Sequence, residues 1–203
     1  AFLEYAELLN FEEKMILAVV QDVLNNRAPE LKILERDLQP LQKLQSPFLR
    51  LTYRETLQKL RELGSDIKDG EDLGNDDETI LMTHFQQPLF VMKFPSSLKA
   101  CYFKRDDQNP DLTLSADLLA PEGYGEVCGG GQREDDDATL LQRMKEANLE
   151  TKDYEWYLDL RKYGTCPHSG FGAGLERLVA WICHLEHIRE AIPFPRTIYR
   201  FTP

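Results

Sequence analysis

Glycine recurs at every second position shortly before an apolar segment near the end of this 203-residue chain. The three positions are Gly170, Gly172 and Gly174. In an extended segment alternate side chains lie on one face, so these glycines leave that face bare and let a flat ligand contact the backbone. Residues 175–183 are apolar on nearly every side, which predicts a buried helix. Arg177 lies in the first turn of that helix, where a buried guanidinium needs a carboxylate or a ligand anion as its partner.

The composition is that of one globular domain or most of one, with 42% hydrophobic and 29% charged residues. No apolar run approaches the roughly 18–20 residues of a membrane span, and no cationic, apolar leader is recognisable. We therefore expect a cytoplasmic protein without a membrane partner. The net charge of -11 argues against a surface that binds nucleic acid by phosphate neutralisation alone. The four cysteines lack metal-ligand spacing and are expected to be reduced thiols.

The pattern of apolar residues indicates an α+β fold with an antiparallel sheet flanked by helices. Its periodicity and capping signals predict helices over residues 2–26, 53–63 and 155–162, with another opened by the three acids at 135–137. Strands are predicted over residues 88–95, 100–104, 112–120 and 125–133. The acidic stretch 66–78 is expected to form a loop or a short helical start, and residues 105–111 a charged turn.

Two carboxylates come from adjacent predicted strands joined by a tight turn. They are Asp117 and Glu126, and the turn covers residues 121–125. This arrangement lets both side chains approach one point. Paired carboxylates near a polyphosphate are the usual way in which proteins hold Mg²⁺. The alternative for Asp117 is an ordinary acid at a strand edge or turn.

A second cluster follows the second carboxylate. Three consecutive glycines beginning at Gly129 let the backbone approach a small substrate closely, and Arg133 ends the segment with a planar donor fork. The alternative for Arg133 is a surface ion pair with Glu134 or Asp135. From the residues alone both interpretations stay open.

The pattern Gly-x-Gly-x-Gly-x-Glu-Arg before an apolar helix resembles motif 3 of the class II aminoacyl-tRNA synthetases, here at residues 170–186. Further segments occur in the order found in asparaginyl-tRNA synthetases of the bacterial type: Phe94-Pro95 with Lys99, residues 116–126, 129–133, 155–164, 167–172 and 187–196. From residue 1 to residue 203 the chain resembles the C-terminal portion of that family's catalytic domain. The resemblance implies that the catalytic domain is incomplete, because the family's N-terminal OB-fold, motif 1 and motif 2 are not recognisable in these residues.

The resemblance implies a two-step reaction in the complete protein. L-Asparagine would be activated by ATP to asparaginyl-adenylate and then transferred to tRNA(Asn). Glu126 and Asp117 would bind Mg²⁺ and ATP, Arg133 would bind the side-chain oxygen of the amino acid, and Gly129 would line its pocket. The ATP-binding residues implied at motif 3 are Gly174, Leu175, Glu176 and Arg177, with Arg177 and Glu126 contributing to catalysis.

The resemblance also implies a homodimer that holds tRNA(Asn) through the N-terminal domain and the active site, and predicts that residues 1–203 alone are inactive. Lys99 to Tyr102, Lys-Ala-Cys-Tyr, stands where aspartyl enzymes usually have Arg-Pro-Phe-Tyr, which favours asparagine. Aspartyl or relaxed specificity remains an alternative. So does a synthetase-derived protein without ligase activity, either a binding or regulatory module or an asparagine-synthesising relative.

Overall fold

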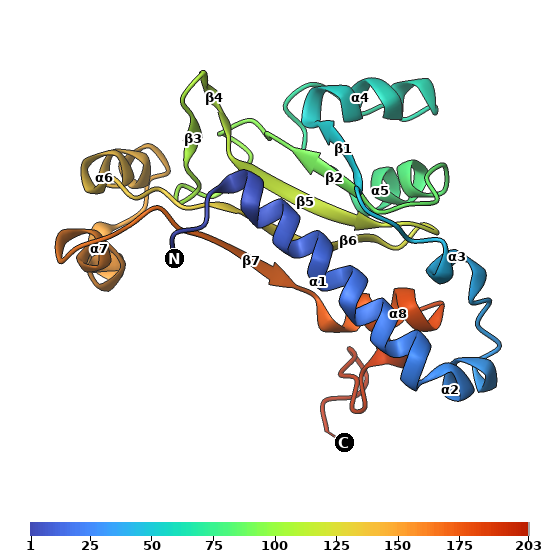
Figure 1. Cartoon of the computed structure of the whole chain (residues 1–203). Coiled ribbons are helices and arrows are strands. Elements are labelled where there is room, and N and C mark those ends of the chain that lie inside the picture. Colours follow the sequence, from blue (N-terminus) through green and yellow to red (C-terminus); the bar gives the residue numbers. More distant parts are fainter. Residues whose placement is uncertain (203) are drawn as a thin grey trace.

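The computed structural model describes residues 1–202 and contains a five-stranded sheet in the order β1-β2-β5-β6-β7 (Figure 1). The strands of this sheet are β1 (Leu49–Thr52), β2 (Leu89–Met92), β5 (Ser115–Ala120), β6 (Gly125–Gln132) and β7 (Ser169–Ala173). All neighbouring pairs are antiparallel except β1 and β2, which are parallel. The predicted antiparallel sheet is therefore confirmed apart from one edge, because β1 was not predicted.

The helices lie around this sheet. They are α1 (Tyr5–Asn26), α2 (Ala28–Ile33), α3 (Gln39–Gln42), α4 (Tyr53–Glu62), α5 (Asn75–Met82), α6 (Asp137–Glu146), α7 (Glu155–Lys162) and α8 (Leu175–Cys183), with 3₁₀ turns at Thr151–Tyr154 and Ile188–Ala191. Thr52 caps α4 through the predicted capping box with Glu55. Within the described residues no helix is both long and apolar enough to cross a membrane.

Two predictions between β2 and β5 are wrong. Residues 100–104, expected as a strand, form turns with an isolated bridge at Phe103. The expected charged turn at 105–111 contains a hairpin, made by β3 (Arg105–Asp106) and β4 (Asn109–Thr113). Arg105 pairs with Thr113 and Asp106 with Asn109, whereas the bridge of Phe103 is to Arg133, so polar residues form a separate two-stranded ladder that their composition did not indicate.

Each face of the sheet has its own core. Phe90, Leu118 and Cys128 lie on the face covered by α1 and α8, as Figure 1 shows for α1. Leu89 and Leu119 lie on the other face, where α4 packs against β1 and β2 and α5 packs against β5 and β6. Among the described residues, none of β6 or β7 belongs to this second core.

The row of paired residues across this second face changes chemistry from strand to strand. Val91 of β2 pairs with Asp117 of β5, which pairs with Gly129 of β6, which pairs with Gly172 of β7. The row passes from a buried apolar side chain to a carboxylate and then to two glycines. Cross-strand partners share a face, so the row ends in a bare backbone floor with an acid at its edge.

Candidate active site

The two predicted carboxylates do meet at one point, beside Gly129. A Cβ atom placed on Gly129 would lie 2.6 Å from Oε1 of Glu126 and 3.3 Å from Oδ1 of Asp117. A bulge explains why residues 126 and 129 share a face. Leu118 pairs with Cys128 while the next residue pairs with Glu126, so Val127 is the extra residue that shifts the alternation.

Asp117 has a fixed cationic partner and also lies close to a second acid. Its Oδ2 lies 2.5 Å from Nζ of Lys99, whose ammonium also sits 3.8 Å from the ring centroid of Phe94. Burial raises the pKa of Asp117 to about 6, although Lys99 acts in the opposite direction, and the nearby Glu126 raises it further. A divalent cation at this point would relieve the repulsion between the two acids.

A third carboxylate, Glu78 of α5, lies beside this pair and was not predicted. Its Oε2 accepts a 2.8 Å hydrogen bond from the backbone N–H of Glu126. Burial raises the pKa of Glu78, and Glu126 and Asp117 contribute to the increase. The signal available in the sequence is three acids at the start of an apolar segment, which is typical of a helix N-terminus. Residues 66–78 are expected to form a loop or a short helical start, and α5 begins within them, but no role is assigned there to Glu78.

Arg177 lies at the end of the glycine floor, in the first turn of α8. Its Nη1 donates a 2.8 Å hydrogen bond to the carbonyl oxygen of Glu126 and lies 4.0 Å from the Glu126 carboxylate. Its side chain is 46% exposed, so the expected buried guanidinium is wrong. The difference arises because α8 is buried only along one face, through Leu178, Trp181 and neighbouring residues. Arg177 is therefore free to contact a ligand above the floor.

The other predicted residues of motif 3 differ in their surroundings. Gly174 is the N-cap of α8, and its N–H bonds to the carbonyl of Val127. Leu175 is 68% exposed and Glu176 is also exposed. All of them lie at the junction of β7 and α8, as predicted. The side chains of Leu175 and Glu176 form no hydrogen bond or ion pair within residues 1–202, so only the backbone there is fixed.

Arg133 lies at the opposite end of β6 and lines a cavity of about 300 Å³ together with Tyr102, Tyr154, Trp156 and Tyr157. Its Nη2 donates a 3.1 Å hydrogen bond to the carbonyl of Gly170, and its guanidinium carbon lies 4.8 Å from the ring centroid of Tyr102. Its Nη1 is buried and has no hydrogen-bond partner among the described residues. Burying a donor without an acceptor is costly, so the geometry favours a ligand oxygen at this position.

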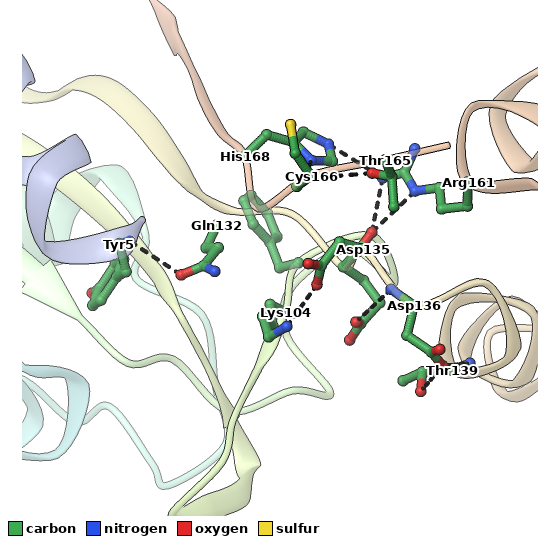
Figure 2. A network of polar contacts seen from close by, with 12 residues as sticks. Tyr5, Lys104, Gln132, Asp135, Asp136, Thr139, Arg161, Thr165, Cys166 and His168 are labelled. Carbon is green, nitrogen blue, oxygen red and sulfur yellow. Dashed lines mark hydrogen bonds and ion pairs between the residues drawn. The ribbon is translucent and has the colours of Figure 1, made fainter. Parts of the chain in front are cut away.

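The alternative ion pair of Arg133 with its neighbours does not form. Asp135 is paired with Lys104 at 2.6 Å (Figure 2). A side-chain oxygen of Glu134 accepts from the backbone N–H of Asp136. The buried Arg161 donates from Nε and Nη2 to the carbonyl of Glu134, at 3.0 and 2.9 Å. These contacts fix the backbone that follows Arg133 and leave its guanidinium free for the cavity.

Within residues 1–202 no group of three His, Cys, Asp or Glu side chains is arranged to hold a metal ion. Asp117 and Glu126 fit a different kind of site. Mg²⁺ is often held by one or two carboxylates together with phosphate oxygens and retained waters. The donor set therefore suits a cation that arrives with a polyphosphate.

Comparisons with known proteins agree with this architecture. Residues 1–198 match the family model of tRNA synthetases class II (D, K and N). The chain therefore belongs to this family of class II synthetases. Among the particular relatives, an asparagine–tRNA ligase of Pelotomaculum thermopropionicum is 49% identical over 203 residues, covering 100% of this chain and 47% of the relative.

Solved structures agree. The asparaginyl-tRNA synthetase of Pyrococcus horikoshii superposes with a TM-score of 0.96 at 46% identity, covering 100% of this chain and 48% of that one. The same enzyme complexed with asparaginyl-adenylate also gives a TM-score of 0.96 at 46% identity and is covered to 47%. The chain thus spans about half the length of the relatives that it matches.

Proposed function

We propose that this chain supplies the C-terminal portion of the catalytic domain of an asparagine–tRNA ligase, with motif 3 at residues 170–186. The observation that carries the proposal is the glycine floor of Gly129 and Gly172, which is open above Gly172 and bordered at Gly129 by two carboxylates, with Arg177 at its end. Such a floor suits a nucleotide that lies flat on the backbone. The similarity of the chain to asparagine–tRNA ligases supports the choice of reaction.

In the proposed reaction the carboxylate of asparagine attacks the α-phosphorus of ATP, and pyrophosphate leaves. Asp117 and Glu126 would hold Mg²⁺, which neutralises phosphate charge when bound. Arg177, half exposed above the floor, would bind the pyrophosphate end of the nucleotide. These residues act by positioning and by neutralising charge, and they take part in no covalent bond. The terminal hydroxyl of the tRNA would then accept the asparaginyl group.

The side chain of the amino acid is assigned to Arg133. Its buried, unpartnered Nη1 is a donor without an acceptor, and the amide oxygen of asparagine would supply one. Gly129 would line the same pocket between Glu126 and the cavity of Arg133. A carboxylate would also satisfy Arg133, so discrimination against aspartate depends on further groups.

The remaining parts of the proposal concern the complete protein. We propose that it acts as a cytoplasmic homodimer and binds tRNA(Asn) through the active site and an N-terminal domain. Residues 1–203 alone are expected to be inactive. The resemblance assigns a ligand of the ATP α-phosphate to motif 2, and motif 2 is not recognisable in these residues.

The test is amino-acid-dependent ATP–pyrophosphate exchange, measured with this chain and with an N-terminally extended chain of the relatives' length. We expect exchange in the longer protein with asparagine and none with aspartate. Equal rates with both amino acids would instead indicate relaxed specificity. ATP binding without exchange in the longer protein would overturn the ligase assignment in favour of a non-ligase module.

A further inference from the structure

A second polar cavity, of about 380 Å³, lies between the segment after β2 and helix α6. The residues that matter for its chemistry are Ser96, Ser97, Lys99, Arg105, Arg143 and Glu146. Three of these side chains are cationic and one is acidic. A cationic pocket in a chain with a net charge of -11 is not a consequence of overall composition.

The cations of this pocket are poorly compensated. Arg143 of α6 is 3% exposed and donates from Nη1 to the carbonyl of Phe103, but it forms no ion pair with any of the described residues. Arg105 pairs with Glu146 at 2.9 Å, yet its Nε is buried without a partner. Lys99 is held by Asp117, so Glu146 is the acid left to balance two guanidiniums.

The two arginines also disfavour each other. Burial lowers the pKa of Arg143, and the positive charge of Arg105 lowers it further. The ordinary solution for a buried cation beside a half-buried one is a shared anion. A bound anion here would accept from the free donors and remove the repulsion.

We propose that this pocket binds a phosphate group through Arg105 and Arg143, with the hydroxyls of Ser96 and Ser97 as additional donors. Two guanidiniums and two hydroxyls surround one space, which suits the four oxygens of a phosphate better than the two of a carboxylate. The volume leaves room for an attached ester group. The phosphate has two possible sources, a free phosphate or pyrophosphate ion and a phosphodiester of RNA. The site depends on residues other than those assigned to the ligase reaction.

The test is calorimetric titration of the chain with inorganic phosphate and pyrophosphate, after circular dichroism has shown that each variant is folded. Arg105→Gln removes a charge from a half-buried position, and we expect it to raise the Kd about tenfold or more. Glu146→Gln removes the competing acid, so we expect it to lower the Kd. Lys145→Gln makes the same charge change as Arg105→Gln at an exposed neighbour outside the pocket, and we expect no effect.

The decisive result is that Arg105→Gln and Glu146→Gln change the Kd in opposite directions while Lys145→Gln leaves it unchanged. A general effect of net charge would instead make Lys145→Gln behave like Arg105→Gln. A parallel titration with a short RNA hairpin carrying a single-stranded 3′ end identifies the source. Weaker RNA binding in Arg105→Gln assigns the site to a phosphodiester, and unchanged RNA binding with weaker phosphate binding assigns it to the free ion. The proposal would be overturned if none of the three ligands bound at millimolar concentration. It would also be overturned if Arg105→Gln bound all three as tightly as the starting protein.

Discussion

Glu78 accepts a 2.8 Å hydrogen bond from the backbone N–H of Glu126, and this contact joins helix α5 to strand β6 at the edge of the glycine floor. The strand is bulged at this point, where Glu126 points to the same side as Gly129. Glu78 thus fixes the backbone that directs the second carboxylate. It also adds negative charge next to Asp117 and Glu126.

We predict that Glu78 contributes to pyrophosphate exchange mainly by positioning Glu126. In Glu78→Gln the side-chain oxygen can still accept from the Glu126 N–H, so pyrophosphate exchange in the extended protein should stay within about threefold of the starting rate. In Glu78→Ala the acceptor is lost, and exchange should fall about 10–100-fold, the usual range for residues that orient metal ligands. Equal losses in the two variants would show that the charge of Glu78 matters more than its hydrogen bond.

Arg177 should be essential to exchange. Arg177→Ala removes the donor fork above the floor, and we expect a loss of at least about 100-fold, as for other groups that neutralise charge during phosphoryl chemistry. Arg177→Lys should recover part of the rate, because it keeps the charge. Arg54→Ala, at an exposed site on α4, is the control. An unchanged exchange rate in Arg177→Ala would remove Arg177 from the ATP site.

Arg133 should act on the amino acid. Arg133→Lys keeps the charge but loses the planar fork that lies against Tyr102 and bonds to Gly170, so the KM for asparagine should rise about tenfold or more. The KM for ATP should change far less. A defect confined to the transfer to tRNA, with normal exchange, would contradict the assignment.

The sequence predicted those parts of the fold in which local pattern and tertiary packing agree. Helix α7 has the predicted bounds, Glu155–Lys162, and the glycine segment leads into α8 as expected. The error at residues 100–104 has a specific cause: the Phe103 N–H bonds to the carbonyl of Ala100 and closes a turn where the apolar pattern indicated a strand. Hydrogen bonding thus overrides strand propensity there.

The residues of the candidate site divide in the same way, into those predictable from local sequence and those that depend on contacts across the fold. Asp117 and Glu126 could be paired from the turn between them, because they are close along the chain. Glu78 could not, since its contact joins residues 48 positions apart. The exposure of Arg177 depends on which side of α8 packs on the sheet, and an almost uniformly apolar helix does not reveal that side.

Stability should fall as pH rises towards alkaline values because of Glu12. This residue of α1 is fully buried, neither carboxyl oxygen has a hydrogen-bond partner, and burial raises its pKa from 4.5 to about 8, with Asp117 adding to the shift. The folded state therefore holds a proton that the unfolded chain loses. The free energy of unfolding contributed by Glu12 decreases between about pH 4.5 and 8 and is constant above that range.

Glu12→Leu should flatten this decrease and raise the free energy of unfolding at pH 8 by about 1–3 kcal/mol, the usual cost of an unsatisfied buried group. The neighbouring Glu13 provides the opposite control. Its carboxylate accepts from the Phe48 N–H at 2.8 Å and from the Ser46 hydroxyl, so Glu13→Leu should destabilise the protein. Urea unfolding at pH 6 and 8 measures both variants. A steeper pH dependence in Glu12→Leu would show that Glu12 has a stabilising partner.

Two glycines of the floor allow the effect of a substitution on ligand contact to be distinguished from its effect on folding. A Cβ at Gly129 would lie 2.6 Å from Glu126, whereas a Cβ at Gly172 would meet nothing within 4 Å. Gly129→Ala should therefore displace Glu126 and impair exchange through the acid.

Gly172→Ala should leave the melting temperature nearly unchanged, because its methyl group enters open space above the sheet. If a nucleotide lies on that floor, the same methyl group occupies its place, and the KM for ATP in the extended protein should rise about tenfold or more while the KM for asparagine changes little. A normal KM for ATP in a stable Gly172→Ala protein would mean that the nucleotide does not lie on β7, and the bare row would then have only a packing role.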